Sequence, residues 1–121
     1  MLKLIVGTKG SGKTKTMIDM IDKATKTTSG NINHAARLVD VDEYGVAGAD
    51  MLYGFVAGVL AGNYDITELF IDGILRIIDH DMDAAAKVLA KIDKVTQNIE
   101  VVVTVSADAA ALPEELKKYV I

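Results

Sequence analysis

Short apolar runs alternate along this chain with longer segments whose apolar residues recur at helical spacing. The apolar runs span residues 2–6, 66–72 and 99–106, and the last of them is β-branched almost throughout. Such runs predict buried strands, and the β-branched run predicts a central one. Shorter strands are expected at about 37–41 and at 119–121. The alternation predicts an α/β fold, a three-layer sandwich with a mostly parallel sheet.

The helical pattern is clearest directly after the first strand. Residues 13 to about 26 carry an apolar set, which consists of Met17, Ile18, Met20, Ile21 and Ala24. Residues 42–62 and about 81–96 are expected to form two further helices, and Pro113 suits the first turn of a short helix through about residue 118. The connection at 30–36 is short and poor in strand formers, so either the edge strand after it is reduced or a segment has been shortened.

The second expected helix contains an uncharged stretch, residues 51–62, in which every fourth residue from Gly54 is glycine. Gly54, Gly58 and Gly62 therefore share one helix face and allow close backbone contact. The stretch is too short to span a membrane. Two interpretations remain open: close packing of a buried helix on the sheet, and a contact between copies of the chain in a homo-oligomer.

Composition narrows the functional classes. A chain of 121 residues predicts a single domain over 1–121, and its core must be aliphatic because aromatic residues are few. The net charge of −4 and a total of two arginines, Arg37 and Arg76, argue against nucleic-acid binding. The absence of cysteine excludes disulfides and thiolate metal sites. No signal-peptide pattern follows Met1, so a cytoplasmic protein without a membrane segment is expected.

Residues 7–14 read Gly-Thr-Lys-Gly-Ser-Gly-Lys-Thr, which matches the phosphate-binding pattern G-x-x-x-x-G-K-[ST] between an expected strand and an expected helix. The glycines let successive backbone N–H groups surround a phosphate, and the helix start adds unpaired N–H groups and a positive dipole end. Lys13 would reach the β- and γ-phosphates, and the Thr14 hydroxyl would bind Mg²⁺. The alternative is a chance glycine-rich turn. The candidate nucleotide-binding residues are Gly7, Thr8, Lys9, Gly10, Ser11, Gly12, Lys13, Thr14 and Lys15.

The strand at 66–72 ends in the run Leu-Phe-Ile-Asp, which resembles a Walker B strand whose acid supports Mg²⁺, often through water. Asp72 is thus the second candidate metal residue beside Thr14, and the alternative is that it caps the next turn. Many phosphate-loop ATPases carry a catalytic glutamate directly after this acid. Here the next residue is Gly73, so slow hydrolysis is expected.

Ser106 and Asp108 follow the strand at 99–105 and are candidates, with Lys13, for a catalytic role. A polar residue at that strand end is where a γ-phosphate sensor would lie, although both side chains could instead cap a turn. Lys9 and Arg76 could complete the site of a neighbouring subunit, but a solvated lysine and a surface arginine are the simpler interpretations. The acidic run at 79–83 lacks the pattern of a calcium loop and is expected to be a solvated loop and helix start.

Taken together, the segments LIVGTKGSGKTKTMIDMI, RLVDVDEYG, YGFVAGVLAGNYDIT, LFIDG and VTVSAD with LPEELKKY resemble small bacterial P-loop proteins that are often catalogued with twitching-motility ATPases. The resemblance covers most of the chain and departs at 30–36. It implies nucleotide binding on residues 7–14 and Asp72, without implying a physiological role. The pattern also resembles the RecA-like branch, which implies the strand order 5-1-4-3-2.

The function expected from the sequence is Mg²⁺-dependent binding of a nucleoside triphosphate, with ATP favoured over GTP, and hydrolysis that is weak or depends on a partner. Two alternatives stay open. One is a small phosphotransferase, against which the scarcity of arginine and the lack of a long lid count. The other is a scaffold that keeps the phosphate loop only for stability.

Overall fold

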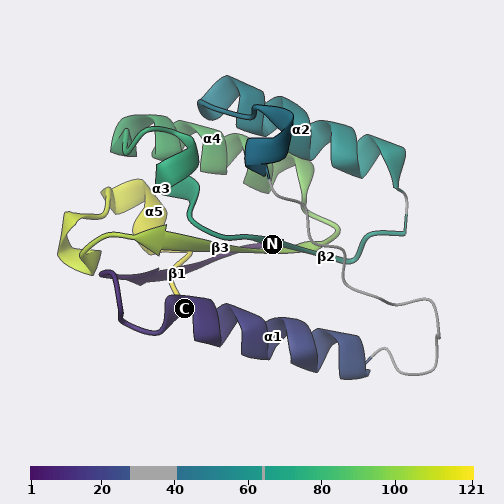
Figure 1. The fold of residues 1–121 in the computed structure, drawn as a ribbon, viewed down its shortest axis with the longest axis horizontal. Coiled ribbons are helices and arrows are strands. Elements are labelled where there is room, and N and C mark those ends of the chain that lie inside the picture. The colour runs from purple at the N-terminus through teal and green to yellow at the C-terminus, as the bar shows by residue number, and fades with distance from the viewer. Residues whose placement is uncertain (28–40, 64) are drawn as a thin grey trace.

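The computed structural model describes residues 1–27, 41–63 and 65–121. Within these ranges the chain forms a three-stranded parallel sheet with helices on both faces (Figure 1). The strands are β1 (Leu2–Gly7), β2 (Glu68–Ile71) and β3 (Glu100–Ser106), in the order β1-β3-β2. The predicted α/β class with a parallel sheet is therefore confirmed, and so is the position of the β-branched strand between the other two.

The central position of β3 follows from its composition. Its residues from Val101 to Val105 are all buried, because helices cover both faces of the sheet and strands flank both edges of β3. Parallel strands that are covered on both faces read as continuous apolar runs rather than alternating ones. The register pairs Val6 with Val105 and Ile71 with Val103, so the carboxyl ends of all three strands lie at one edge of the sheet.

The predicted last strand is present as a single parallel bridge between Val120 and Leu4. The N–H of Leu4 donates to the carbonyl of Tyr119 at 2.8 Å, and the N–H of Ile121 donates to the carbonyl of Leu4 at 3.0 Å. Since both polar groups of a strand residue point to the same side, this segment lies on the edge of β1 opposite to β3.

One face of the sheet is covered by α1 (Lys13–Thr27), and the other by the helices α2 (Ala49–Gly62), α3 (Ile74–Ile77) and α4 (Met82–Val95) (Figure 1). The α2–α4 side holds the larger hydrophobic cluster, with Leu89 and Ile92 fully buried. A smaller cluster of Ile5, Met17 and Val102 seats α1. The remaining elements are the 3₁₀ turns η1 (Val41–Tyr44) and η2 (Ala109–Ala111) and the short helix α5 (Glu114–Lys117).

The continuous helix expected over 42–62 is wrong. The chain instead forms η1, then a turn, and α2 begins only at Ala49. Gly45 and Gly48 have φ angles of 66° and 88°, in the left-handed region that ends regular helix. The expected strand at 37–41 lies outside the described residues except for Val41, which begins η1. The segment 30–36 lies outside them as well.

The glycine face of α2 does not pack on the sheet. Gly54, Gly58 and Gly62 are exposed, and a Cβ atom added at any of them would meet nothing within 4 Å. The helix contacts α4 and the core through Leu52 and Val56 on another face. The expectation of close backbone packing here is therefore wrong, whereas a contact between copies of the chain stays a prediction. No helix in the described ranges has the length and the apolar run that a membrane crossing requires.

Candidate functional site

The loop between β1 and α1 is held in shape by its glycines. Gly10 and Gly12 have φ angles of 85° and 90°, which other residues rarely adopt. Gly7 meets a different constraint, because a Cβ atom there would lie 2.3 Å from the Oγ atom of Ser11. The N–H of Ser11 closes the turn by donating to the carbonyl of Thr8 at 3.1 Å. Glycine conformations and a local turn therefore shape this loop, and the N–H of Ala107, which donates to the carbonyl of Gly7 at 3.1 Å, anchors its start to the end of β3.

The first turn of α1 leaves backbone N–H groups without helical partners. Its first helical hydrogen bond runs from the N–H of Thr16 to the carbonyl of Gly12, at 3.0 Å. The N–H groups before Thr16 have no partner within the helix, and Gly12 has no side chain to cap them. The first turn contains no acid and two lysines, Lys13 and Lys15. A helix start with unpaired N–H groups and no nearby acid has the chemistry to bind an anion.

Lys13 lies folded over the loop that it follows. Its Nζ atom donates to the carbonyl of Thr8 at 2.9 Å, and the side chain is half-buried. A lysine ammonium carries more than one N–H donor, so this contact leaves others for a ligand. Lys13 lines the same cleft as Asp72 and Ser106, which follow or end strands of the sheet.

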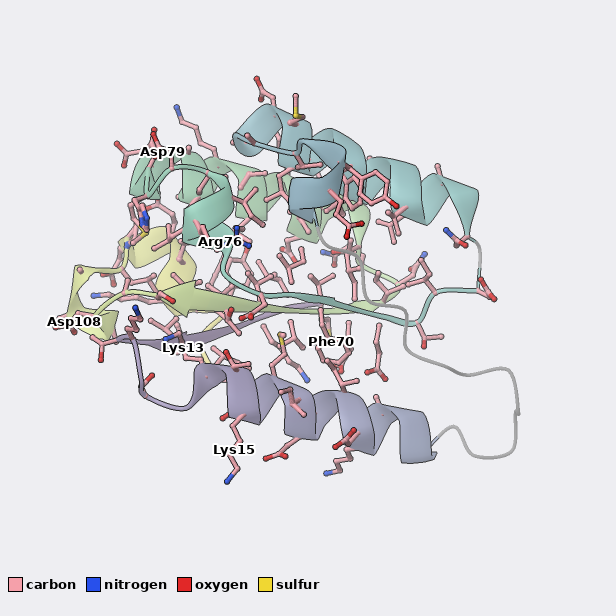
Figure 2. The ribbon with its side chains drawn as sticks, viewed as in Figure 1. Lys13, Lys15, Phe70, Arg76, Asp79 and Asp108 are labelled. Carbon is pink, nitrogen blue, oxygen red and sulfur yellow. The ribbon has the colours of Figure 1, made fainter. Side chains whose placement is uncertain are left out.

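An open cleft of about 660 Å³ lies at this edge of the sheet. The glycine-rich loop between β1 and α1 and the start of α1 form one wall. The ends of β2 and β3 form the floor, and residues of α3 and the turn after it form the other wall. The lining residues are Lys9, Gly10, Gly12, Lys13, Thr14, Lys15, Asp72, Gly73, Leu75, Arg76, His80 and Ser106. Lys13 and Arg76 reach it from opposite faces of the sheet (Figure 2). Segments far apart in the sequence thus meet in one cleft.

Most of the predicted site residues meet in this cleft, but not all contribute in the same way. Lys15 is a lining residue of the cleft, but its side chain extends away from the sheet (Figure 2). Gly7, Thr8 and Ser11 are not among the lining residues. Ser11 instead borders a second, smaller hollow of about 370 Å³ on the α1 side of the loop.

Asp72 follows the last residue of β2, and its position is set by a buried partner. The Oδ1 atom of Asp72 accepts a hydrogen bond from the hydroxyl of Thr104 at 2.5 Å. The same hydroxyl accepts a hydrogen bond from the N–H of Gly73 at 2.7 Å. The carboxylate of Asp72 is exposed towards the cleft, whereas Thr104 is only 1% exposed. The carboxylate is therefore held in place by a buried residue of the central strand β3.

The sequence analysis did not identify Thr104 as a site residue, although the sequence pattern around it indicated one. It is the single polar residue in the buried run from Val101 to Val105. A buried hydroxyl needs a hydrogen-bond partner, so an isolated one in a central strand indicates a nearby polar group. The sequence could not identify that group, because Asp72 is 32 positions away.

The backbone conformation at position 73 explains why glycine, and not the glutamate of many phosphate-loop ATPases, follows Asp72. Gly73 has φ 71° and ψ 46°, a left-handed conformation at the start of α3. An L-amino acid pays about 1–2 kcal/mol in this conformation. The backbone of this turn, which the hydrogen bond to Thr104 holds in place, is therefore suited to glycine and not to glutamate.

Ser106 and Asp108 behave differently from each other. Ser106 ends β3 and lines the cleft with Asp72. Asp108 is not a lining residue and lies at the outer end of the sheet (Figure 2). Its Oδ1 atom accepts a hydrogen bond from the N–H of Ala110 at 3.0 Å and so begins η2. Of the two interpretations of Asp108, the structure supports the turn cap.

The wall opposite the glycine-rich loop contains two residues to which the sequence assigned no firm role. Arg76 and His80 both line the cleft of their own chain. His80 follows Asp79, and both residues have positive φ angles, 57° and 58°. The N–H of His80 donates to the carbonyl of Leu75 at 2.6 Å, which fixes this turn. In the acidic run, Asp81 caps α4 by accepting from the N–H of Ala84 at 3.1 Å, as expected for a helix start.

Thr14 and Asp72 carry oxygen atoms of the kinds that bind magnesium. Both residues line the cleft, and hydroxyl and carboxylate oxygens are the ligands that this cation prefers. The described residues contain no group of three or more His, Cys, Asp or Glu side chains that could hold a metal by themselves. Mg²⁺ is typically bound by one or two protein oxygens together with substrate phosphates, so the donor set suits a metal that arrives with a ligand.

Comparisons of the chain with protein-family models, with curated proteins and with solved structures gave no match. The interpretation of the cleft therefore rests on its geometry and on the sequence pattern of the loop.

Proposed function

We propose that the chain binds a magnesium–nucleoside triphosphate complex in the cleft, with ATP as the first candidate and GTP as the second. One observation carries the proposal. The glycine-rich loop with Lys13 and Thr14, and the acid that follows β2, line the same cleft although 58 positions separate Thr14 from Asp72. A chance glycine-rich turn would have no reason to meet a carboxylate from the far side of the central strand.

The charge and the size of the cleft support this proposal. Lys9, Lys13 and Arg76 supply positive charge to the lining, and Asp72 is the single acid among the lining residues that the structure describes, although the chain as a whole carries a net charge of −4. Local charge of the opposite sign to the whole protein indicates a site for an anion. The cavity volume of about 660 Å³ falls within the roughly 300–1,000 Å³ of small-molecule sites.

Each group has a distinct task in the proposed complex. The N–H groups of the phosphate loop and of the first turn of α1 surround a phosphate, and Lys13 adds a charge-assisted hydrogen bond. Thr14 and Asp72 hold the metal, Asp72 directly or through water. Magnesium, when bound, neutralises phosphate charge and orients the phosphoryl group.

The strand order supports the RecA-like branch of P-loop proteins. In that branch, with the order 5-1-4-3-2, the strand that follows the Walker B strand along the chain lies between the Walker B strand and the loop strand. The order observed here, with Val120 outside β1 and then β3 and β2, corresponds to its first four members. Membership of the P-loop class, and the likeness to the small bacterial proteins, are part of this proposal.

Hydrolysis by the isolated chain is proposed to be slow, well below the about 1–100 s⁻¹ of efficient phosphoryl-transfer enzymes. The place of the usual glutamate is held by a left-handed glycine, and Asp108 caps a turn. The loop and Lys13 stabilise the bound triphosphate nearly as much as the transition state, and such uniform binding does little for kcat. Arg76 lies in the cleft of its own chain, so a contribution in trans is not required for it to approach the phosphates.

One experiment tests the proposed function. Binding of ATP, GTP and the corresponding diphosphates is measured by calorimetry with Mg²⁺ and with EDTA, and phosphate release is followed on the same samples. We expect magnesium-dependent triphosphate binding with slow release. Fast release that is independent of protein concentration would contradict the slow-hydrolysis proposal. Release that appears only with an added phosphate acceptor would support a phosphotransferase, and no binding of any nucleotide would support the scaffold.

A further inference from the structure

We propose that Thr104 is a positioning residue, whose hydroxyl fixes the carboxylate of Asp72 in the orientation that magnesium requires and fixes the turn at Gly73 with it. This inference rests on the proposed function, and it deepens that function by assigning a role to a residue that does not touch the ligand.

The register of the sheet brings Thr104 to this place. Ile71 pairs with Val103, so the next residue of each segment, Asp72 and Thr104, continues the alignment. The hydroxyl of Thr104 then lies 2.5 Å from the Oδ1 atom of Asp72 and 2.7 Å from the N atom of Gly73. A side chain that is 1% exposed and carries two such bonds has little freedom to turn.

The direction of both hydrogen bonds is fixed by chemistry. A backbone N–H can only donate, so the hydroxyl oxygen of Thr104 accepts from Gly73. An ionised carboxylate can only accept, so the single hydroxyl proton of Thr104 goes to Asp72. This proton is then committed, and Thr104 cannot also donate to a γ-phosphate. The geometry therefore assigns a positioning role, and not the sensor role, to Thr104.

The bond from Thr104 also gives the two sides of the Asp72 carboxylate different roles. One oxygen is bonded from inside the protein, from the central strand, and the residue remains exposed at the cleft. The lone pairs that the bond to Thr104 does not use are free for a cation or its water. Outer partners of this kind orient metal-binding carboxylates, and their loss typically weakens metal affinity about 10- to 100-fold.

The competing explanation is that Thr104 serves only the fold, by pairing the N–H of Gly73 in a buried turn. Thr96 offers a matched control for this possibility. It is equally buried, at 1% exposure, and its hydroxyl donates to the carbonyl of Ile92 at 2.6 Å. It precedes the amino end of β3, so it lies at the opposite end of that strand from the cleft. Thr96→Val therefore removes a buried hydroxyl without touching Asp72.

The test measures ATP affinity by calorimetry, in Mg²⁺ and in EDTA, for the native chain and for Thr104→Val, Thr104→Ser and Thr96→Val. Thermal unfolding of each variant is recorded in parallel. We expect Thr104→Val to weaken binding in Mg²⁺ about 10-fold or more and to leave binding in EDTA unchanged. Thr104→Ser, which keeps both hydrogen bonds, should retain native affinity, and so should Thr96→Val. If Thr104→Val does not fold, Thr104→Ala takes its place, because its smaller side chain admits a water to the N–H of Gly73.

A double variant provides the second readout. If Thr104 acts through Asp72, then adding Thr104→Val to Asp72→Ala should cause no further loss of affinity in Mg²⁺. Additive losses would overturn the inference, as would equal losses in Mg²⁺ and EDTA or unchanged magnesium dependence in Thr104→Val. A native chain that binds no nucleotide in Mg²⁺ would overturn the proposed function and this inference together. Magnesium-dependent binding that is as tight in Thr104→Val as in the native chain would overturn this inference alone.

Discussion

Replacing Lys13 by alanine tests the proposed site most directly. The Nζ atom of Lys13 contacts the carbonyl of Thr8 at 2.9 Å and has donors to spare for a phosphate. A hydrogen bond between charged partners contributes about 1.5–3 kcal/mol. At about 1.4 kcal/mol for each tenfold change, Lys13→Ala should weaken binding of ATP in Mg²⁺ about 10- to 140-fold.

The same substitution should leave the fold intact. The contact between Lys13 and Thr8 is exposed, so water can replace the lost hydrogen bond. Alanine is also the best helix former, at a position in the first turn of α1. The free energy of unfolding should therefore change by no more than about 0.5 kcal/mol. A loss of binding without a loss of stability would place the effect in the cleft.

Calorimetric titration with ATP in Mg²⁺ measures the affinity, and denaturant unfolding measures the stability. Lys23→Ala is the matched control, because Lys23 is an exposed lysine on the same helix that does not line the cleft. It removes the same charge at a different place. Equal affinities of the native chain and Lys13→Ala would refute the assignment of the phosphate loop. Equal losses in Lys13→Ala and Lys23→Ala would show that net charge, rather than a specific contact, governs binding.

Four further substitutions test the proposed metal ligands and the glycine backbone conformations separately. Asp72→Ala and Thr14→Ala should each lower ATP affinity about 10-fold or more in Mg²⁺ and little in EDTA, which calorimetry in the two buffers checks; a change of stability with intact magnesium dependence would make Asp72 structural. Gly73→Ala should destabilise the fold by about 1 kcal/mol, because a left-handed residue costs about 1–2 kcal/mol and the stiffer unfolded chain offsets about 0.4–1 kcal/mol. Gly58→Ala, on the exposed face of α2, should instead stabilise it by about 0.5–1 kcal/mol, so equal signs in denaturant unfolding would contradict the backbone argument.

The sequence determined those features that depend on neighbouring residues. Glycines at fixed positions, a buried strand before them and a periodic helix after them were enough to predict the loop at 7–14 and its flanking elements. The β-branched run at 99–106 was enough to predict a central strand, because only a strand covered on both faces tolerates so many apolar residues in succession.

The prediction that the glycine face of α2 packs on the sheet was wrong, because it depended on more than neighbouring residues. Three glycines at every fourth position indicate a smooth helix face, but not what lies opposite that face. The structure turns this face outward and buries Leu52 and Val56 instead, because larger apolar side chains bury more surface than glycine does. The break at Gly45 and Gly48 likewise depended on backbone angles that composition does not specify.

Only the tertiary structure decided which residues meet at the cleft. Asp72, Thr104 and Gly73 form one hydrogen-bonded unit because the register between β2 and β3 brings residues 32 positions apart to the same level of the sheet. In the same arrangement Ser106 lines the cleft, whereas Asp108 caps a turn outside it. Local sequence sets the conformation of a segment, but the pairing of strands sets the distance between segments, and this distance determines which side chains can share a ligand.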